Sequence, residues 1–121
     1  MDEITIVLPL PNRALSPNAR VHWAHKAKHV REYRKTAWAA TLEAAGPQAL
    51  WTKATAKVSF FFPDNRRRDA DNAMASLKAA WDGMRDAGLI ADDSAKVLTM
   101  EPAEFHVDGK DPRVEIRMRR L

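Results

Sequence analysis

Four aspartates stand out in this sequence because their number and spacing suit a cation site. Asp69 and Asp71 are two residues apart, and the pair Asp92-Asp93 follows the next predicted helix. In an extended segment, side chains two residues apart project to the same side, so the first two carboxylates could share a hard cation. A third carboxylate from Asp92 or Asp93 would help fill the octahedral oxygen shell of Mg²⁺. Such an ion would activate water for attack on a phosphodiester.

A purely structural interpretation of the same aspartates stays open at this point. Asp71 lies where a helix is predicted to start, so it could be the N-cap that accepts backbone N–H bonds. Asp69 and the two later aspartates would then be ordinary loop residues. The pattern Asp-x-Asp-Asn is short and common, and on its own it favours this interpretation.

Lys78 is a further candidate for chemistry beside these aspartates. It follows Asp71 by seven residues, and at about 100° per residue it returns to the same face of a helix. Its ammonium could reach a phosphate and offset charge in the transition state. The alternative is an ordinary i,i+4 surface pair with Asp82.

Positive charge is concentrated in three places, which are residues 13–35, 66–68 and 113–120. The chain has 20 Lys and Arg against 16 Asp and Glu. The segment from Arg13 to Lys35 contains a single acid, Glu32. Basic surface of this kind predicts a polyanion partner, with a solvated mixed-charge surface as the alternative. The residues that we expect to hold a nucleic-acid backbone are Arg66, Arg67, Arg68, Arg20, Lys26, Lys28 and Arg31.

Histidine and tryptophan in the first basic segment allow more than one interpretation. The histidines are His22, His25 and His29. Their spacing could suit a metal on a helix, but their basic surroundings favour backbone contact with DNA, or plain surface, over zinc. Trp23 could stack on a base or be buried in the core or an interface. Trp38 and Trp81 are expected in the core.

The elements that must position these residues predict an α+β fold in one domain over 1–121. Their order is β-α-β-α-β-β, which we expect to form a mixed sheet packed with two main helices. The predicted elements are a strand at 3–8, a loop at 9–18, a helix at 23–45 stopped by Gly46-Pro47, a strand at 53–62, a polar connection at 64–70, a helix at 71–87 followed by Gly88, a strand at 95–107, a hairpin-type turn at Asp108-Gly109 and a strand at 113–119.

Composition excludes several classes of chemistry. The sequence has no cysteine, so disulfides, thiolate metal sites and cysteine nucleophiles are excluded. The N-terminus opens Met-Asp-Glu without a basic stretch or an apolar run, which predicts no secretory signal. No apolar run is long enough to span a bilayer. We therefore expect a cytoplasmic protein without a membrane partner.

Three blocks of the sequence resemble the RusA family of Holliday junction resolvases. They read Phe-Pro-Asp-Asn-Arg-Arg-Arg-Asp-Ala-Asp-Asn, Leu-Lys-Ala-Ala-Trp-Asp and Ala-Gly-Leu-Ile-Ala-Asp-Asp-Ser. The N-terminal strand, which runs into Leu-Pro-Leu-Pro and Ser16-Pro17-Asn18, is similar as well. Because the blocks agree in order and spacing over nearly the whole chain, the resemblance is far more specific than Asp-x-Asp-Asn alone. It shifts the balance from the structural interpretation to the catalytic one.

The resemblance implies a homodimer that makes paired, symmetric, metal-dependent nicks in a four-way DNA junction, in recombination and repair. It implies Mg²⁺, for which Mn²⁺ could substitute, and a place near the nucleoid of a bacterial host, often in phages and prophages. The essential aspartates would fall on Asp69, Asp71 and one or both of Asp92 and Asp93, and the lysine on Lys78. Lys78 departs from the best-known family pattern by about one helical turn, or about 5 Å along the axis.

Physical arguments agree with this expectation and leave rivals to test. A junction has approximate two-fold symmetry, which a C2 dimer matches with two equivalent sites, and a basic surface supplies salt-dependent affinity for phosphates. One alternative is a nuclease of broader substrate specificity that also cuts flaps or forks. Another is a non-catalytic DNA-binding protein with structural aspartates. A phosphoesterase acting on nucleotides is disfavoured, because the charge is positive and no phosphate-cradling glycine loop is present.

Overall fold

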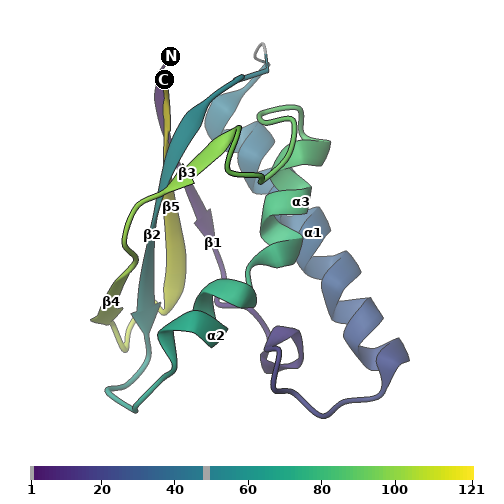
Figure 1. The fold of residues 1–121 in the computed structure, drawn as a ribbon. Coiled ribbons are helices and arrows are strands. Elements are labelled where there is room, and N and C mark those ends of the chain that lie inside the picture. The colour runs from purple at the N-terminus through teal and green to yellow at the C-terminus, as the bar shows by residue number, and fades with distance from the viewer. Residues whose placement is uncertain (1, 48–49) are drawn as a thin grey trace.

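A sheet forms one layer of the molecule and helices cover one of its faces, as the computed structural model shows for residues 2–47 and 50–121 (Figure 1). The elements are β1 (Glu3–Leu8), the short 3₁₀ helix η1 (Arg13–Leu15), α1 (Trp23–Ala45), β2 (Ala54–Phe62), α2 (Ala70–Ala75), α3 (Lys78–Asp86), β3 (Leu98–Met100), β4 (Glu104–Val107) and β5 (Arg113–Arg120). The predicted α+β class and the mixed sheet are confirmed. Among the described residues, no helix is long and apolar enough to cross a membrane.

The sheet has the strand order β1-β5-β2-β3, and β4 also pairs with β2. β5 runs antiparallel to both β1 and β2, whereas β3 and β4 run parallel to β2. β3 pairs with the first residues of β2 and β4 with its last residues, so the two short strands share one edge. β1 alternates exposed and buried residues along its whole length. Such alternation lets one face of the sheet build the core while the other stays accessible to water.

α1 and α3 cross so closely that only a glycine fits between them. A Cβ atom on Gly83 would lie 2.4 Å from the carbonyl oxygen of Arg34. The Arg34 side chain also forms a bidentate ion pair with Asp86 at the end of α3. The Tyr33 hydroxyl donates to the Pro9 carbonyl at 2.8 Å and ties α1 to the loop after β1. α1 is therefore joined to α3 by close packing and an ion pair, and to the loop after β1 by a hydrogen bond.

Most element boundaries agree with the sequence. The predicted elements 3–8 and 23–45 are confirmed residue for residue, and 53–62 and 113–119 to within one residue at one end. Gly46 and Gly88 both have positive φ, 64° and 83°, as expected for glycines that end helices. Trp81 is buried as predicted, but Trp38 is 40% exposed, so the prediction of a core position for Trp38 is wrong. It lies on the outer side of a helix whose inner side is already filled.

The predicted helix over 71–87 is two helices in the structure, with a break at Ser76 and Leu77. The Ser76 hydroxyl donates to the Ala73 carbonyl at 2.6 Å, a local bond that competes with the regular helical ladder. Leu77 is fully buried and adopts φ −91° and ψ 3°. The regularly spaced apolar residues of this region therefore belong to two short helices that pack on the core. They do not line one face of a single continuous helix.

The predicted strand over 95–107 is divided into β3 and β4, and the predicted hairpin after it is absent. Pro102 lies between the two strands and has no N–H for the ladder. β4 and β5 both pair with β2 and not with one another. The Asp108 N–H donates to the Phe62 carbonyl at 2.8 Å, so the turn passes across the end of β2. The dipeptide Asp108-Gly109 signals a turn correctly but says nothing about which strands it joins.

Candidate active site

Asp69 and Asp71 lie at the start of α2, and Asp69 caps it. Asp69 has extended backbone angles, φ −83° and ψ 119°, and its Oδ1 accepts a bond from the Asn72 N–H at 3.1 Å. Asp71 lies in the first turn, so the suggestion that Asp71 is the N-cap is wrong by two residues. The argument from an extended segment also fails, because only Asp69 is extended. Both carboxylates are exposed at the same helix end.

Lys78 begins α3 and joins two carboxylates. Its Nζ donates to Asp93 Oδ2 at 3.0 Å and to Asp82 Oδ1 at 3.2 Å. The bond to Asp93, followed by that to Asp82, raises the pKa of the Lys78 ammonium and keeps it charged. The predicted i,i+4 pair therefore exists, but it is half of a larger arrangement. The break at 76–77 means that Lys78 does not continue the helix of Asp71, so the face argument from helical periodicity does not apply.

Asp92 and Asp93 have different partners although they are neighbours. Asp92 Oδ1 accepts a bond from the Ser94 N–H at 2.7 Å. Bonds from Ser94, together with the positive charges of Arg85 and Lys78, lower the pKa of Asp92 below its ordinary value. Asp92 is therefore held ionised by its own turn, while Asp93 reaches across to α3.

The four aspartates offer the right chemistry for a hard divalent cation, since all are carboxylate oxygen donors. Within residues 2–47 and 50–121, however, no three acidic or histidine side chains gather closely enough to hold a metal ion. The candidates form two pairs, one at the start of α2 and one after α3. The donor types fit Mg²⁺, but their arrangement in this single chain does not complete a site.

The three consecutive arginines differ in their exposure and in their contacts, and Asp64 is the partner of two of them. The guanidinium of Arg68 lies 4.1 Å from the centre of the Phe62 ring and donates to Asp64 Oδ1 at 2.9 Å. Arg66 pairs with Asp64 Oδ2 at 3.0 Å but its side chain is 82% exposed. The bond from the Arg66 N–H, followed by that from Arg68, lowers the pKa of Asp64. Arg67 is exposed and has no side-chain partner among the described residues.

Asp64 was missed by the sequence reasoning. Its spacing of two residues from Arg66 was the available signal, because aspartate often accepts the backbone N–H two residues on. Arg68 thus positions the loop. Arg66 is exposed although it pairs with Asp64, and Arg67 is exposed without a side-chain partner in the described part of the chain, so both are accessible to a ligand.

The first basic segment is exposed at the start of α1. His22 caps this helix, with Nδ1 accepting from the Ala24 N–H at 3.1 Å. His25 and His29 contact one another edge to face at 4.5 Å, and Trp23 is 76% exposed. Trp23 is therefore not a core residue. The exposed cations that have no side-chain partner within the described ranges include Arg20, Lys26, Lys28 and Arg31.

A model of the endodeoxyribonuclease RusA family matches residues 8–119. The chain belongs to the RusA family of endodeoxyribonucleases. Every candidate residue above lies inside the matched range. A protein of Xylella fastidiosa (strain Temecula1), described as uncharacterised, is 35% identical over 92 residues, which are 69% of this chain. The match covers 56% of that relative, so the chain spans little more than half of its length.

Proposed function

We propose that this RusA-family endodeoxyribonuclease resolves four-way DNA junctions by paired, symmetric, Mg²⁺-dependent nicks. The observation that carries the proposal is the bond between Lys78 and Asp93. It joins the second and third of the blocks that resemble the family, and so it links a cation to one of the four candidate ligands. Lys78 also bonds to Asp82, one turn further along α3, so its ammonium lies between α3 and the loop that carries Asp92 and Asp93.

The residues that would hold the ion are Asp69, Asp71, Asp92 and Asp93. When bound, Mg²⁺ supplies an activated water and stabilises charge on the scissile phosphate. The chain's own contribution is to hold Asp69 and Asp71 exposed at the start of α2 and to keep Asp92 ionised, which the lowered pKa of Asp92 supports. Lys78 orients Asp93, and its charge would offset that of the phosphate in the transition state. Since no three aspartates meet in the described conformation, binding of one ion by both pairs of aspartates would require local movement.

The DNA backbone would lie along two exposed basic surfaces. One consists of Arg66 and Arg67, directly before α2, and the other of the cations at the start of α1. Lys26 from α1 and Lys78 from α3 line the same pocket, so the second surface adjoins the candidate site. Phosphate contacts of this kind position the substrate without reading its sequence. Arg68 is assigned to support of the loop because it is largely buried against Phe62.

A homodimer is part of the proposal because one site cuts one strand. Symmetric cleavage of a junction needs two equivalent sites related by a two-fold axis, which a C2 dimer supplies.

The test is a cleavage panel on synthetic DNA, end-labelled on each strand in turn. It comprises a four-way junction, a replication fork, a flap and a linear duplex, each with Mg²⁺ and with EDTA. The proposal predicts symmetric, Mg²⁺-dependent nicks in the junction alone. Equal cutting of forks and flaps would replace it with a broader branched-DNA nuclease. Binding without scission in Mg²⁺ would identify a DNA-binding protein with structural aspartates.

A further inference from the structure

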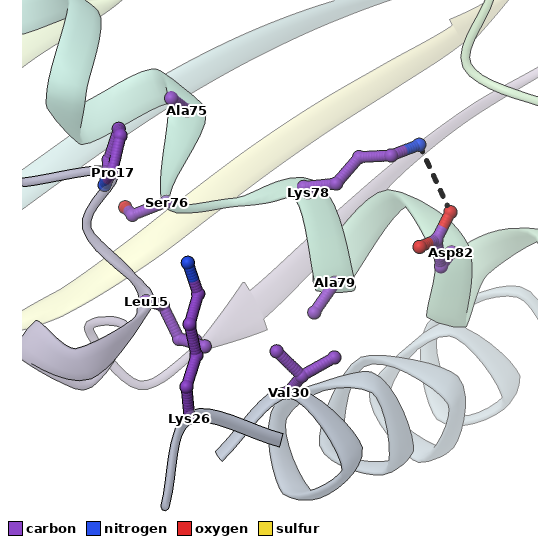
Figure 2. A pocket seen from close by; sticks show the side chains of 9 residues that line it. All are labelled: Leu15, Pro17, Lys26, Val30, Ala75, Ser76, Lys78, Ala79 and Asp82. Carbon is purple, nitrogen blue, oxygen red and sulfur yellow. Dashed lines mark hydrogen bonds and ion pairs between the residues drawn. The ribbon is translucent and has the colours of Figure 1, made fainter. Parts of the chain in front are cut away.

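A pocket of about 280 Å³ lies between the start of α1, the loop after β1 and the junction of α2 with α3. Its walls are largely apolar, and Leu15, Val30 and Ala79 form part of them (Figure 2). In Figure 2, Lys26 extends from α1 toward the α2–α3 junction, while Lys78 lies on the other side and turns toward Asp82. The pocket is thus an apolar slot with charged side chains at its rim.

Lys26 is a charged residue of this pocket whose ammonium is not accounted for by any contact within the described chain. Its ammonium has no hydrogen-bond or ion-pair partner in the described part of the chain. Lys78, by contrast, is bound to Asp82 and Asp93. An unpaired cation beside apolar walls suits a ligand that has both a flat apolar surface and hydrogen-bond acceptors. The carboxylate of Asp82 adds an acceptor for an N–H group on the same ligand.

We infer that this pocket receives one unstacked nucleobase of the bound DNA, next to the phosphate that is cut. The inference rests on the proposed function. Apolar side chains can pack against the flat face of any base, so this contact does not depend on which base is bound. Lys26 would donate to a carbonyl oxygen or ring nitrogen, and Asp82 would accept from an amino group.

The size and position of the pocket favour a base over other occupants. Its volume lies just below the range of small-ligand pockets, roughly 300–1,000 Å³, which suits one planar ring system. A phosphate alone would leave the apolar walls uncovered. Because Lys78 lines the pocket and also holds Asp93, a base in the slot would be close to the candidate catalytic carboxylates. Extruding a base is least costly where pairing is already disturbed, as at a branch point.

The experiment uses 2-aminopurine, a base whose fluorescence rises on unstacking, placed singly at each position around the branch point of the four-way junction. Fluorescence is read with the chain bound in EDTA, so that no cleavage is needed. The wild-type chain should raise the signal several-fold at one position near the branch point. Ala75→Phe places a ring at the pocket from an exposed position of α2, and Lys26→Ala removes the free ammonium. Both should lose most of the rise while junction binding falls by less than about tenfold.

The controls are Ala39→Phe and Lys53→Ala, which make the same changes at exposed positions outside the pocket. Both should keep the wild-type signal. A rise that survives in Ala75→Phe and Lys26→Ala would overturn the inference, as would a bound junction that shows no rise at any position. Nicking of the unmodified junction in Mg²⁺ is measured separately. A chain that binds and unstacks a base but never nicks would refute the proposed function and leave the pocket assignment standing.

Discussion

Lys78 and Asp93 are 15 positions apart in the sequence, yet the lysine Nζ lies 3.0 Å from the aspartate Oδ2. This bond ties the start of α3 to the loop that follows its end, and so fixes one edge of the candidate site. It also explains how Lys78 can serve the site even though the break at Ser76 separates it from α2. Lys78 therefore acts from the side of Asp92 and Asp93, and not as a continuation of the helix that carries Asp71.

Lys78→Ala should lower the rate of junction cleavage by about 10²-fold or more, because it removes both the orientation of Asp93 and a charge near the phosphate. Junction binding should change by only a few-fold. Stability should change by less than about 1 kcal/mol, since Lys78 is largely exposed and surface ion pairs contribute little. Lys96→Ala, an exposed lysine in the same loop region, is the matched control. Single-turnover rates and thermal unfolding measure both effects, and equal rates for the two variants would contradict this role.

Two variants of Asp69 should separate its role as a helix cap from its proposed role as a metal ligand. Asp69→Asn keeps an N-cap acceptor, so its stability should stay close to wild type, whereas Asp69→Ala should lose about 0.5–2 kcal/mol. Both variants should lose cleavage to a similar, large extent, because neither supplies a carboxylate. Chemical denaturation and junction cleavage measured on the same samples check this. Normal cleavage by Asp69→Asn would mean that Asp69 is a cap and nothing more.

Asp71→Asn isolates the second carboxylate of α2. Asp71 is not the cap, so we expect a folded variant that still binds the junction and does not cut it. Mg²⁺ and Mn²⁺ titrations followed by calorimetry should show weaker ion binding than in wild type. Ion affinity and cleavage at the wild-type level would remove Asp71 from the proposed ligands.

Arg67→Ala should weaken binding of four-way junction and duplex DNA alike, because we propose that Arg67 contacts phosphates, which both substrates share. The slope of log affinity against log salt should become shallower by about 0.9 for each phosphate that the variant no longer neutralises. Arg68→Ala should also destabilise the chain, since Arg68 packs on Phe62 and bonds to Asp64. Binding isotherms at several salt concentrations test the pair, and an unchanged slope in Arg67→Ala would remove Arg67 from the interface.

Because Tyr33 is buried, we expect the folded chain to lose stability at alkaline pH. Burial raises the pKa of Tyr33 well above its ordinary value, and its hydroxyl donates to the Pro9 carbonyl. The pKa of Tyr33 is higher in the folded chain than in the unfolded one. The part of the free energy of unfolding that depends on protonated Tyr33 is therefore fully present below about pH 10 and is lost as the pH rises beyond it. Tyr33→Phe should therefore lose less stability than wild type between neutral pH and about pH 11. Denaturant unfolding at both pH values measures this, and parallel losses would contradict the assignment.

The sequence predicts the elements well where local patterns decide them. Alternation gives β1, and the helix over 23–45 ends at Gly46 because the glycine takes a positive φ that other residues avoid. Leu77 shows where local pattern fails. Its spacing fits a continuous helix, but burial in the core and the Ser76 hydroxyl bond break the helix there. Asp108-Gly109 fails in the same way, because pairing partners depend on the whole sheet.

The site was predicted in part for a similar reason. Residue types and order identified Asp69, Asp71, Asp92, Asp93 and Lys78 as candidates, through their resemblance to the family. Spacing did not reveal which of them touch. The bond from Lys78 to Asp93 depends on how the loop after α3 returns, and the role of Asp64 depends on how Arg68 packs against Phe62. Both are tertiary facts that no local pattern encodes.

The most direct test of the central claim uses a supercoiled plasmid that extrudes a cruciform, which is a four-way junction within a closed circle. With Mg²⁺, a dimer that makes paired, symmetric nicks converts the plasmid to the linear form before the junction is released. We expect linear DNA as the first product for wild type, none in EDTA, and none for Asp71→Asn. Accumulation of nicked circles, or an intact plasmid with bound protein, would contradict the claim that this chain resolves junctions.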